Sequence, residues 1–156
     1  MRIKTSLSLL AVFFAASLLA QGPVHYWKDG SWALPDSEVS PGVARTTDKS
    51  EICAPGFTTK KYRHTTEATK HKICAEYGIT GNCPDHQYEI DHIISIEIGG
   101  ADVPGNLWPQ PLGQARVKDK LENRLHKLVC TGKMGLVEAQ RCISTDWVSC
   151  MGISGK

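Results

Sequence analysis

The feature that most constrains the fold is a set of six cysteines, all of which follow an apolar N-terminal stretch. They are Cys53, Cys74, Cys83, Cys130, Cys142 and Cys150. An even number of cysteines in a small exported chain is typical of a disulfide framework. A structural zinc site is the alternative, which the lack of a Cys-x-x-Cys pair disfavours. We therefore expect disulfides. Sequence does not determine their connectivity, and the pairing we choose is Cys74 with Cys83, Cys142 with Cys150, and Cys53 with Cys130.

The expectation of export comes from the first twenty residues. A short basic start precedes an almost wholly apolar run from Leu7 to Ala20, which is too short and too early for a membrane span. This order predicts a secretory signal peptide over residues 1–20. An uncleaved N-terminal helix is the alternative. No cysteine follows the run directly, so a lipoprotein anchor is not indicated, and we expect a periplasmic or secreted protein with no membrane attachment after processing.

The remaining chain has room for one small domain. We expect an irregular N-terminal arm over 21–50, a domain over 51–150 and a short tail over 151–156. The full chain carries a formal charge of +2, and loss of Arg2 and Lys4 with the signal peptide lowers it to about zero. A nucleic-acid binder with this charge must use local patches. Two basic groups flank the middle of the chain: Lys60, Lys61, Arg63, Lys70 and Lys72, then Arg116, Lys118, Lys120, Arg124, Lys127 and Lys133.

Periodicity and turn residues predict a mixed α+β domain. The β-branched run over 87–98 predicts a strand, and 107–110 predicts a short extended piece limited by prolines. Helices are expected over 65–77, 114–131 and 136–146. The second of these has an apolar stripe at Val117, Leu121, Leu125 and Leu128.

The main chemical signal is Asp91 beside His92 within the strand predicted over 87–98. Hydrolysis of a phosphodiester needs a base for the attacking water and a cation for the leaving oxygen. An imidazole and a carboxylate are suited to these two tasks. Three further motifs follow in order: Gly99-Gly100, Asn106-Leu107-Trp108-Pro109 and Lys118-Asp119-x-x-Glu122-Asn123.

Together these motifs resemble the small exported branch of the HNH (His-Me finger) nucleases, and the likeness covers most of the chain after residue 20. The resemblance implies an α+β fold with a small ββα-metal core, additional helices and disulfide bonds. It implies a metal-dependent endonuclease acting on DNA, with RNA as a further substrate. One divalent metal is expected, Mg²⁺ first and Mn²⁺ second. No base-reading element is evident, so low sequence specificity is expected. A monomer is a separate expectation.

The resemblance also assigns roles to individual residues. His92 would be the general base, because its pKa lies near neutrality, and Asp91 would be a metal ligand. Asn106 would hold the loop and orient His92 through its amide. Lys118 or Arg124 would contact the phosphate backbone. Glu89 lies on the same strand face as Asp91 and would support it or pair with a basic residue.

The last metal ligand stays open at this point. The family places it in an early turn of the helix, where this chain offers Gln114. Asp119 and Asn123 are four residues apart and share a helix face, so either could supply the oxygen. We place Asn123 and Asp119 ahead of Gln114. Two other functions remain: an exported binding or structural domain that kept the scaffold without the chemistry, and a metal-dependent hydrolase of another surface polymer.

Overall fold

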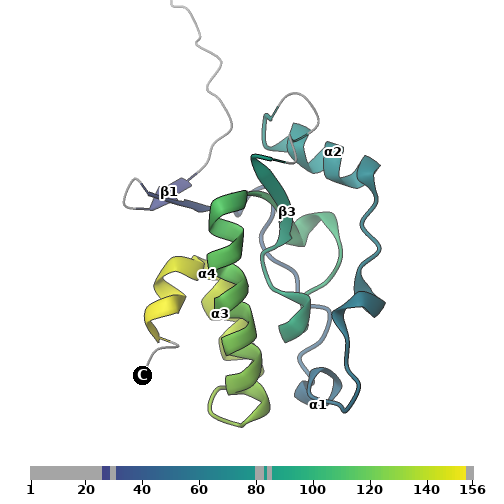
Figure 1. Cartoon of the computed structure of the whole chain (residues 1–156), viewed down its shortest axis with the longest axis vertical. Helices are drawn as coiled ribbons and strands as arrows, with labels where there is room; N and C mark the ends of the chain where they lie inside the picture. Colours follow the sequence, from purple (N-terminus) through teal and green to yellow (C-terminus); the bar gives the residue numbers. More distant parts are fainter. Residues whose placement is uncertain (1–25, 29–30, 80–82, 84–85, 154–156) are drawn as a thin grey trace, which may run out of the picture.

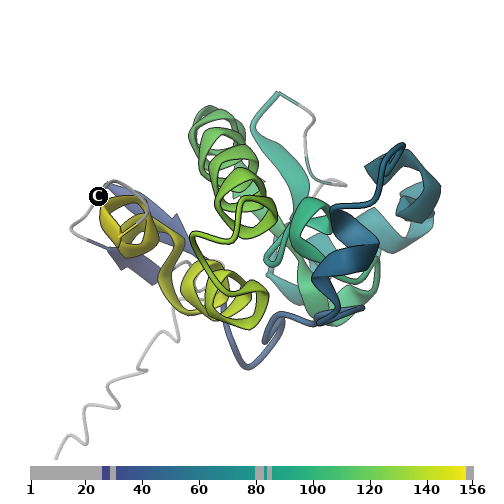
Figure 2. The same cartoon turned by 90° about the horizontal axis from the view of Figure 1, so that it is seen from below.

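The computed structural model describes residues 26–28, 31–79, 83 and 86–153, so the predicted signal peptide lies outside the described residues. The fold is mixed α+β, as expected, with helices around two small sheets (Figure 1). Helix α3 (Leu112–Cys130) runs through the middle of the molecule. Seen from below, α4 (Leu136–Ile153) and the N-terminal sheet lie on one side of α3, and β3 and α2 lie on the other (Figure 2).

The hairpin of strands β3 (Tyr88–His92) and β4 (Leu107–Pro111) carries the Asp-His motif. The strands are antiparallel, with Glu89 opposite Gln110 and Asp91 opposite Trp108, and α3 follows β4 directly. The strand predicted over 87–98 is thus shorter than expected. After His92 the chain turns into a buried loop and a 3-10 turn, η2 (Ile96–Ile98), whose apolar side chains fill the core rather than extend a sheet.

The main core lies between α3 and α4. Leu121 and Leu125 of the predicted stripe are buried there, while Val117 packs at its edge. Helix α4 continues past its predicted end, but Asp146 (φ −164°, ψ 91°) interrupts it. The predicted helix therefore ends where the real one breaks, and the Asp146 side chain caps the second segment by accepting a hydrogen bond from the Ser149 amide.

The segment expected to be an irregular arm contains a hairpin of β1 (Tyr26–Lys28) and β2 (Trp32–Leu34). Tertiary contacts hold β2 in place. Ala33 is fully buried, and its carbonyl accepts a hydrogen bond from the Trp147 indole (3.0 Å). The Trp32 ring meets the Trp147 ring edge to face, with centroids 5.3 Å apart. Strands of three residues give no periodic signal, so sequence patterns could not predict them.

Two short helices precede β3. Helix α1 (Lys49–Ile52) is capped by Asp48, and a 3-10 turn, η1 (Thr59–Tyr62), follows it. Helix α2 (Glu67–Glu76) confirms the helix predicted over 65–77, with the Thr66 side chain as its cap. Helix α2 packs against β4, which places the loop before it beside the end of β3.

All six cysteines are paired as the sequence analysis chose: Cys53–Cys130, Cys74–Cys83 and Cys142–Cys150. The first joins α1 to the end of α3, and the other two close short local loops. Three disulfides in a chain of this size indicate an oxidising compartment. None of the helices in the described part of the chain is long and apolar enough to span a membrane.

Candidate active site around His92

Strand β3 presents Asp91 and His92 to different sides of the hairpin, because successive side chains of a strand alternate. Asp91 faces α3, where its Oδ2 accepts a hydrogen bond from the Lys118 ammonium at 2.8 Å. The His92 side chain lines a cleft on the side of α2. The adjacent pair of residues therefore belongs to two different environments.

His92 is held by an acid that the sequence analysis did not identify. Its Nε2 lies 2.8 Å from Oδ1 of Asp102, and both side chains are buried. Asp102 is itself fixed, since it accepts hydrogen bonds from the His64 backbone amide and the Thr65 hydroxyl. The Asp102 carboxylate is thus held in one orientation, with its Oδ1 next to His92 Nε2.

The pKa shifts define the protonation of this pair. Burial lowers the pKa of His92 below its usual value, and the hydrogen bond to Asp102 offsets only part of this effect. Burial acts to raise the pKa of Asp102, but hydrogen bonds from Thr65, His64 and His92 outweigh it and hold the pKa below its usual value. At neutral pH the pair is a carboxylate and a neutral imidazole. An ionised carboxylate only accepts, so Nε2 carries the proton and Nδ1 is the basic nitrogen.

The cleft in front of His92 has a volume of about 480 Å³. Its far wall comes from α2 and the segment that leads into it, and its other side comes from the β3–β4 hairpin, which includes the acidic side chain of Glu89. Basic side chains on the far wall are Arg63, Lys70 and His71. Lys70 is partly neutralised by Glu67 on the same helix (2.6 Å), whereas the charge of Arg63 reaches the site and lowers the pKa of His92.

Lys118 lies on the other side of β3 and is buried at 1% exposure. Its ammonium donates to Asp91 (2.8 Å), to the His92 carbonyl oxygen (2.6 Å) and to Glu122. Burial alone would lower the pKa of Lys118, but the two carboxylates outweigh it and raise the pKa, so the side chain stays charged. The predicted contact of Lys118 with a phosphate backbone is thereby corrected, because the ammonium is enclosed. Its observed contacts anchor the end of β3 to α3.

The side chains expected to bind a metal do not gather around one point. Asp91 uses both oxygens, since Oδ1 accepts from the His92 amide (2.8 Å) and Oδ2 accepts from Lys118. Asn123 is exposed, and its amide donates to the Asp119 carbonyl oxygen. The side-chain oxygen of Gln114 accepts a hydrogen bond from the backbone amide of Ala33 in β2. Within the described residues, no three His, Cys, Asp or Glu side chains converge at Asp91. The donors in this arrangement do not fit a closed three-ligand site.

Acidic charge is nevertheless concentrated beside Asp91. Burial raises the pKa of Asp119, and the charge of Asp91 raises it further. Burial, Asp91 and Asp119 likewise raise the pKa of Glu89. Asp119 therefore lies near Asp91, and Glu89 lies near both of these carboxylates while it also lines the cleft in front of His92. Arg124, the other candidate for a phosphate contact, is exposed on α3.

Asn106 holds the loop that carries Asp102. It is fully buried, and its amide nitrogen donates to the carbonyl oxygens of Ile94 (2.9 Å) and Ala101 (2.8 Å). Its amide oxygen accepts from the backbone amides of Val43 and Ile94. Asn106 thus holds the loop, and its hydrogen bonds reach backbone groups rather than the imidazole. It positions His92 through the loop and Asp102.

Gly100 is required in the same loop. A Cβ atom at this position would lie 1.8 Å from the Ile94 carbonyl oxygen. The preceding Gly99 has a φ of 83°, which favours glycine. Steric constraints on the backbone therefore explain why glycine occupies both positions. An acid two residues after it was the one sequence signal for Asp102, and an aspartate in a glycine-containing loop is too common to identify a site.

Comparison of the chain with protein-family models, with curated proteins and with solved structures found no match. The function is therefore argued from the geometry of the site and from the motifs. The geometry supplies a neutral imidazole, a carboxylate that fixes its tautomer, and a cleft with a basic wall.

Proposed function

We propose that the protein is an exported endonuclease of the HNH type that hydrolyses phosphodiester bonds of DNA, and of RNA as a second substrate, with low sequence specificity. The observation that carries the proposal is the buried His92–Asp102 pair at the wall of the cleft (2.8 Å). An imidazole that is neutral at physiological pH and oriented by a carboxylate is suited to accept a proton from water.

In this proposal Asp102 accepts the Nε2 proton of His92 and fixes the tautomer. The Nδ1 nitrogen takes a proton from the water that attacks phosphorus. Asp102 also stabilises the imidazolium that forms, because its carboxylate stays ionised. A positioned general base of this kind typically contributes a factor of about 10²–10⁴ to the rate.

Arg63 is the residue we propose for the phosphate. It is exposed, lines the cleft, and lies close enough to affect the pKa of His92. A guanidinium can donate two parallel hydrogen bonds to a phosphate, which fixes orientation as well as charge. Arg63 belongs to the first of the two basic groups in the sequence and takes the role that was expected of Lys118.

No step of the proposal runs through a metal ion, because the expected donors do not converge. Mg²⁺ commonly keeps several waters and is held by one or two carboxylates together with substrate phosphates, where it can stabilise a leaving oxygen. Dependence on Mg²⁺ or Mn²⁺ is thus proposed from the resemblance alone, and chelation tests it directly. Export is proposed from the predicted signal peptide together with the disulfides.

A non-catalytic nucleic-acid-binding domain is the second candidate, and the unassembled donor set at Asp91 favours it. Incubation of residues 21–156 with supercoiled plasmid and with RNA separates the two. The nuclease should nick and linearise plasmid in Mg²⁺ or Mn²⁺ and should stop in EDTA. Retarded mobility without cleavage in any metal would support the binding domain. Cleavage unchanged after exhaustive chelation would remove the metal from the proposal and leave His92 as its base.

A further inference from the structure

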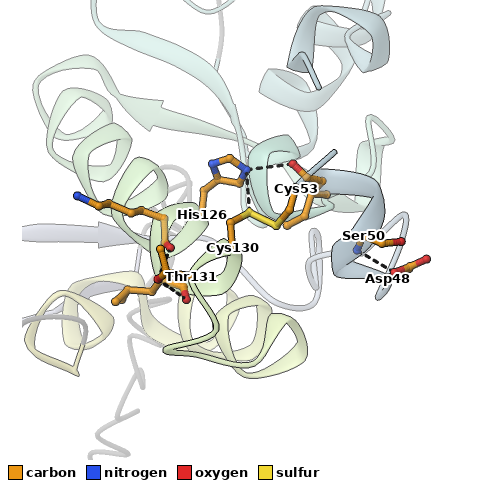
Figure 3. The surroundings of a disulfide bond; sticks show 9 residues. Asp48, Ser50, Cys53, His126, Cys130 and Thr131 are labelled. Atoms are coloured by element: carbon orange, nitrogen blue, oxygen red, sulfur yellow. Dashed lines mark hydrogen bonds between the residues drawn. A yellow bond between two sulfur atoms is a disulfide. The ribbon is translucent and has the colours of Figure 1, made fainter. Parts of the chain in front are cut away.

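A second cluster of reactive side chains surrounds the Cys53–Cys130 disulfide, away from His92 (Figure 3). His126 lies one helical turn before Cys130 on α3, so its imidazole and the cysteine share a helix face. Cys53 lies at the end of α1 and is bonded to Cys130 of α3. Figure 3 shows the His126 imidazole directed at the sulfur atom of Cys130 and at a backbone carbonyl oxygen, that of Ile52.

The three donor atoms are close enough to bind one ion. His126 Nε2 lies 3.5 Å from Cys130 Sγ, and the donor atoms of Cys53, His126 and Cys130 all lie within 4.8 Å of one another. Zinc bonds to thiolate and imidazole are about 2.0–2.3 Å long. Two donor atoms bound to the same zinc ion are therefore farther apart than one such bond, and the 3.5 Å between His126 Nε2 and Cys130 Sγ fits this separation. The imidazole is thus already in place.

We propose that reduction of the Cys53–Cys130 disulfide creates a three-ligand site for a thiophilic divalent cation such as Zn²⁺, with His126 as the third ligand. The disulfide takes two electrons and two protons from a dithiol, which becomes a disulfide itself. Zn²⁺ then displaces the two thiol protons and binds the Nε2 lone pair. The same residues thus form a covalent cross-link in one redox state and a metal cross-link in the other.

Little backbone movement is required. The Cα atoms of Cys53 and Cys130 are 5.5 Å apart, so the sulfur atoms can separate by rotation of the side chains. The Phe57 ring stacks on His126, with centroids 6.1 Å apart, and restricts the imidazole. All three ligand residues are only partly buried, so an ion has access and solvent can fill the fourth position.

His126 has a different role while the disulfide is intact. Its Nε2 lies 3.1 Å from the Ile52 carbonyl oxygen, which can only accept, so Nε2 carries the proton in that state. Metal binding moves this proton to Nδ1 and exchanges the hydrogen bond for a ligand bond. Within the described chain, Cys53, His126 and Cys130 are the cysteine-containing group that meets the distance requirement for a metal. The other two disulfides therefore serve as internal controls.

The test uses residues 21–156, reduced with a dithiol, freed of reductant without oxygen, and titrated with Co²⁺ and then Zn²⁺. Thiolate ligation to Co²⁺ gives a charge-transfer absorption that carboxylates do not give. We expect one equivalent of Co²⁺ with this absorption, and its displacement by Zn²⁺. The double variant Cys53→Ser/Cys130→Ser should lose the absorption, whereas the matched control Cys142→Ser/Cys150→Ser should keep it. His126→Ala should weaken binding at least about tenfold.

Equal absorption in the two double variants, or none in the parent, would overturn the proposal. Reduction could also unfold the chain, and circular dichroism then provides the readout. Zn²⁺ should restore the native spectrum of the reduced parent and of Cys142→Ser/Cys150→Ser, but not that of His126→Ala. Failure to restore the parent, or equal recovery of His126→Ala, would contradict a metal site at this disulfide.

Discussion

Replacement of Lys118 by methionine should destabilise the fold strongly. Methionine fills similar space but removes the ammonium that contacts Asp91, Glu122 and the His92 carbonyl oxygen. Removing one partner of a buried ion pair typically costs about 3–5 kcal/mol, since the remaining charge is left uncompensated. We expect a loss in this range, because two buried carboxylates share the one ammonium. That is a large fraction of the roughly 5–15 kcal/mol that stabilises a domain.

Urea unfolding with the disulfides intact measures this loss. Lys120→Met is the matched control, since Lys120 is exposed on the same helix and should change stability by no more than about 0.5 kcal/mol. The pH dependence gives a second check. Burial already raises the pKa of Glu122, and loss of the ammonium raises it further. The deficit of Lys118→Met should therefore be largest at alkaline pH and should narrow as the pH falls toward about 7, the pKa of Glu122 in the parent, because the Glu122 carboxyl of the variant is protonated first. A loss below about 1 kcal/mol at neutral pH would refute this account of the cluster.

Three further outcomes are expected. Asp102→Asn should lower the cleavage rate at least about tenfold, and the pH–rate profile should show its acidic midpoint moved to lower pH, because the hydrogen bond to Asp102 raises the pKa of His92. An unmoved midpoint would contradict the pairing. Gly100→Ala should markedly lower the thermal midpoint, since its Cβ would meet a backbone oxygen at 1.8 Å. Loss of the Cys53–Cys130 disulfide, which spans 77 residues, should cost about 4–5 kcal/mol in denaturant unfolding, whereas a cost no greater than that of a short-loop disulfide would contradict the loop-entropy argument.

The parts of the fold that sequence could predict are those with local patterns. The apolar stripe of α3, the cap of α2 at Thr66 and the breaks at glycine are encoded within a few residues. The disulfide pairing was one choice among fifteen that the sequence left open, and it was confirmed. The β1–β2 hairpin was missed, because Ala33 depends on partners in α3 and α4 that are far away in the sequence.

The site was predicted only in part for the same reason. The motif identified His92 and Asp91, but the acid that holds His92 comes from a loop and is fixed by the segment before α2. The resemblance assigned Lys118 to a phosphate contact, a role that requires an exposed side chain. Its burial depends on Asp91, which lies 27 residues earlier in the chain. The charge of a lysine in the sequence does not show whether its side chain is exposed to solvent or buried in an ion-pair cluster.

The measurement that tests the central claim most directly is the rate of plasmid cleavage by His92→Ala. The His92 side chain is buried, contacts Asp102 and lines the cleft, so its loss should lower the free energy of unfolding, while the circular dichroism spectrum should stay native under the assay conditions. His86→Ala, which removes an exposed imidazole, is the matched control and should cleave at the parent rate. The account predicts that His92→Ala cleaves roughly a hundredfold more slowly, or slower still. A folded His92→Ala protein that cleaves at the parent rate would contradict it.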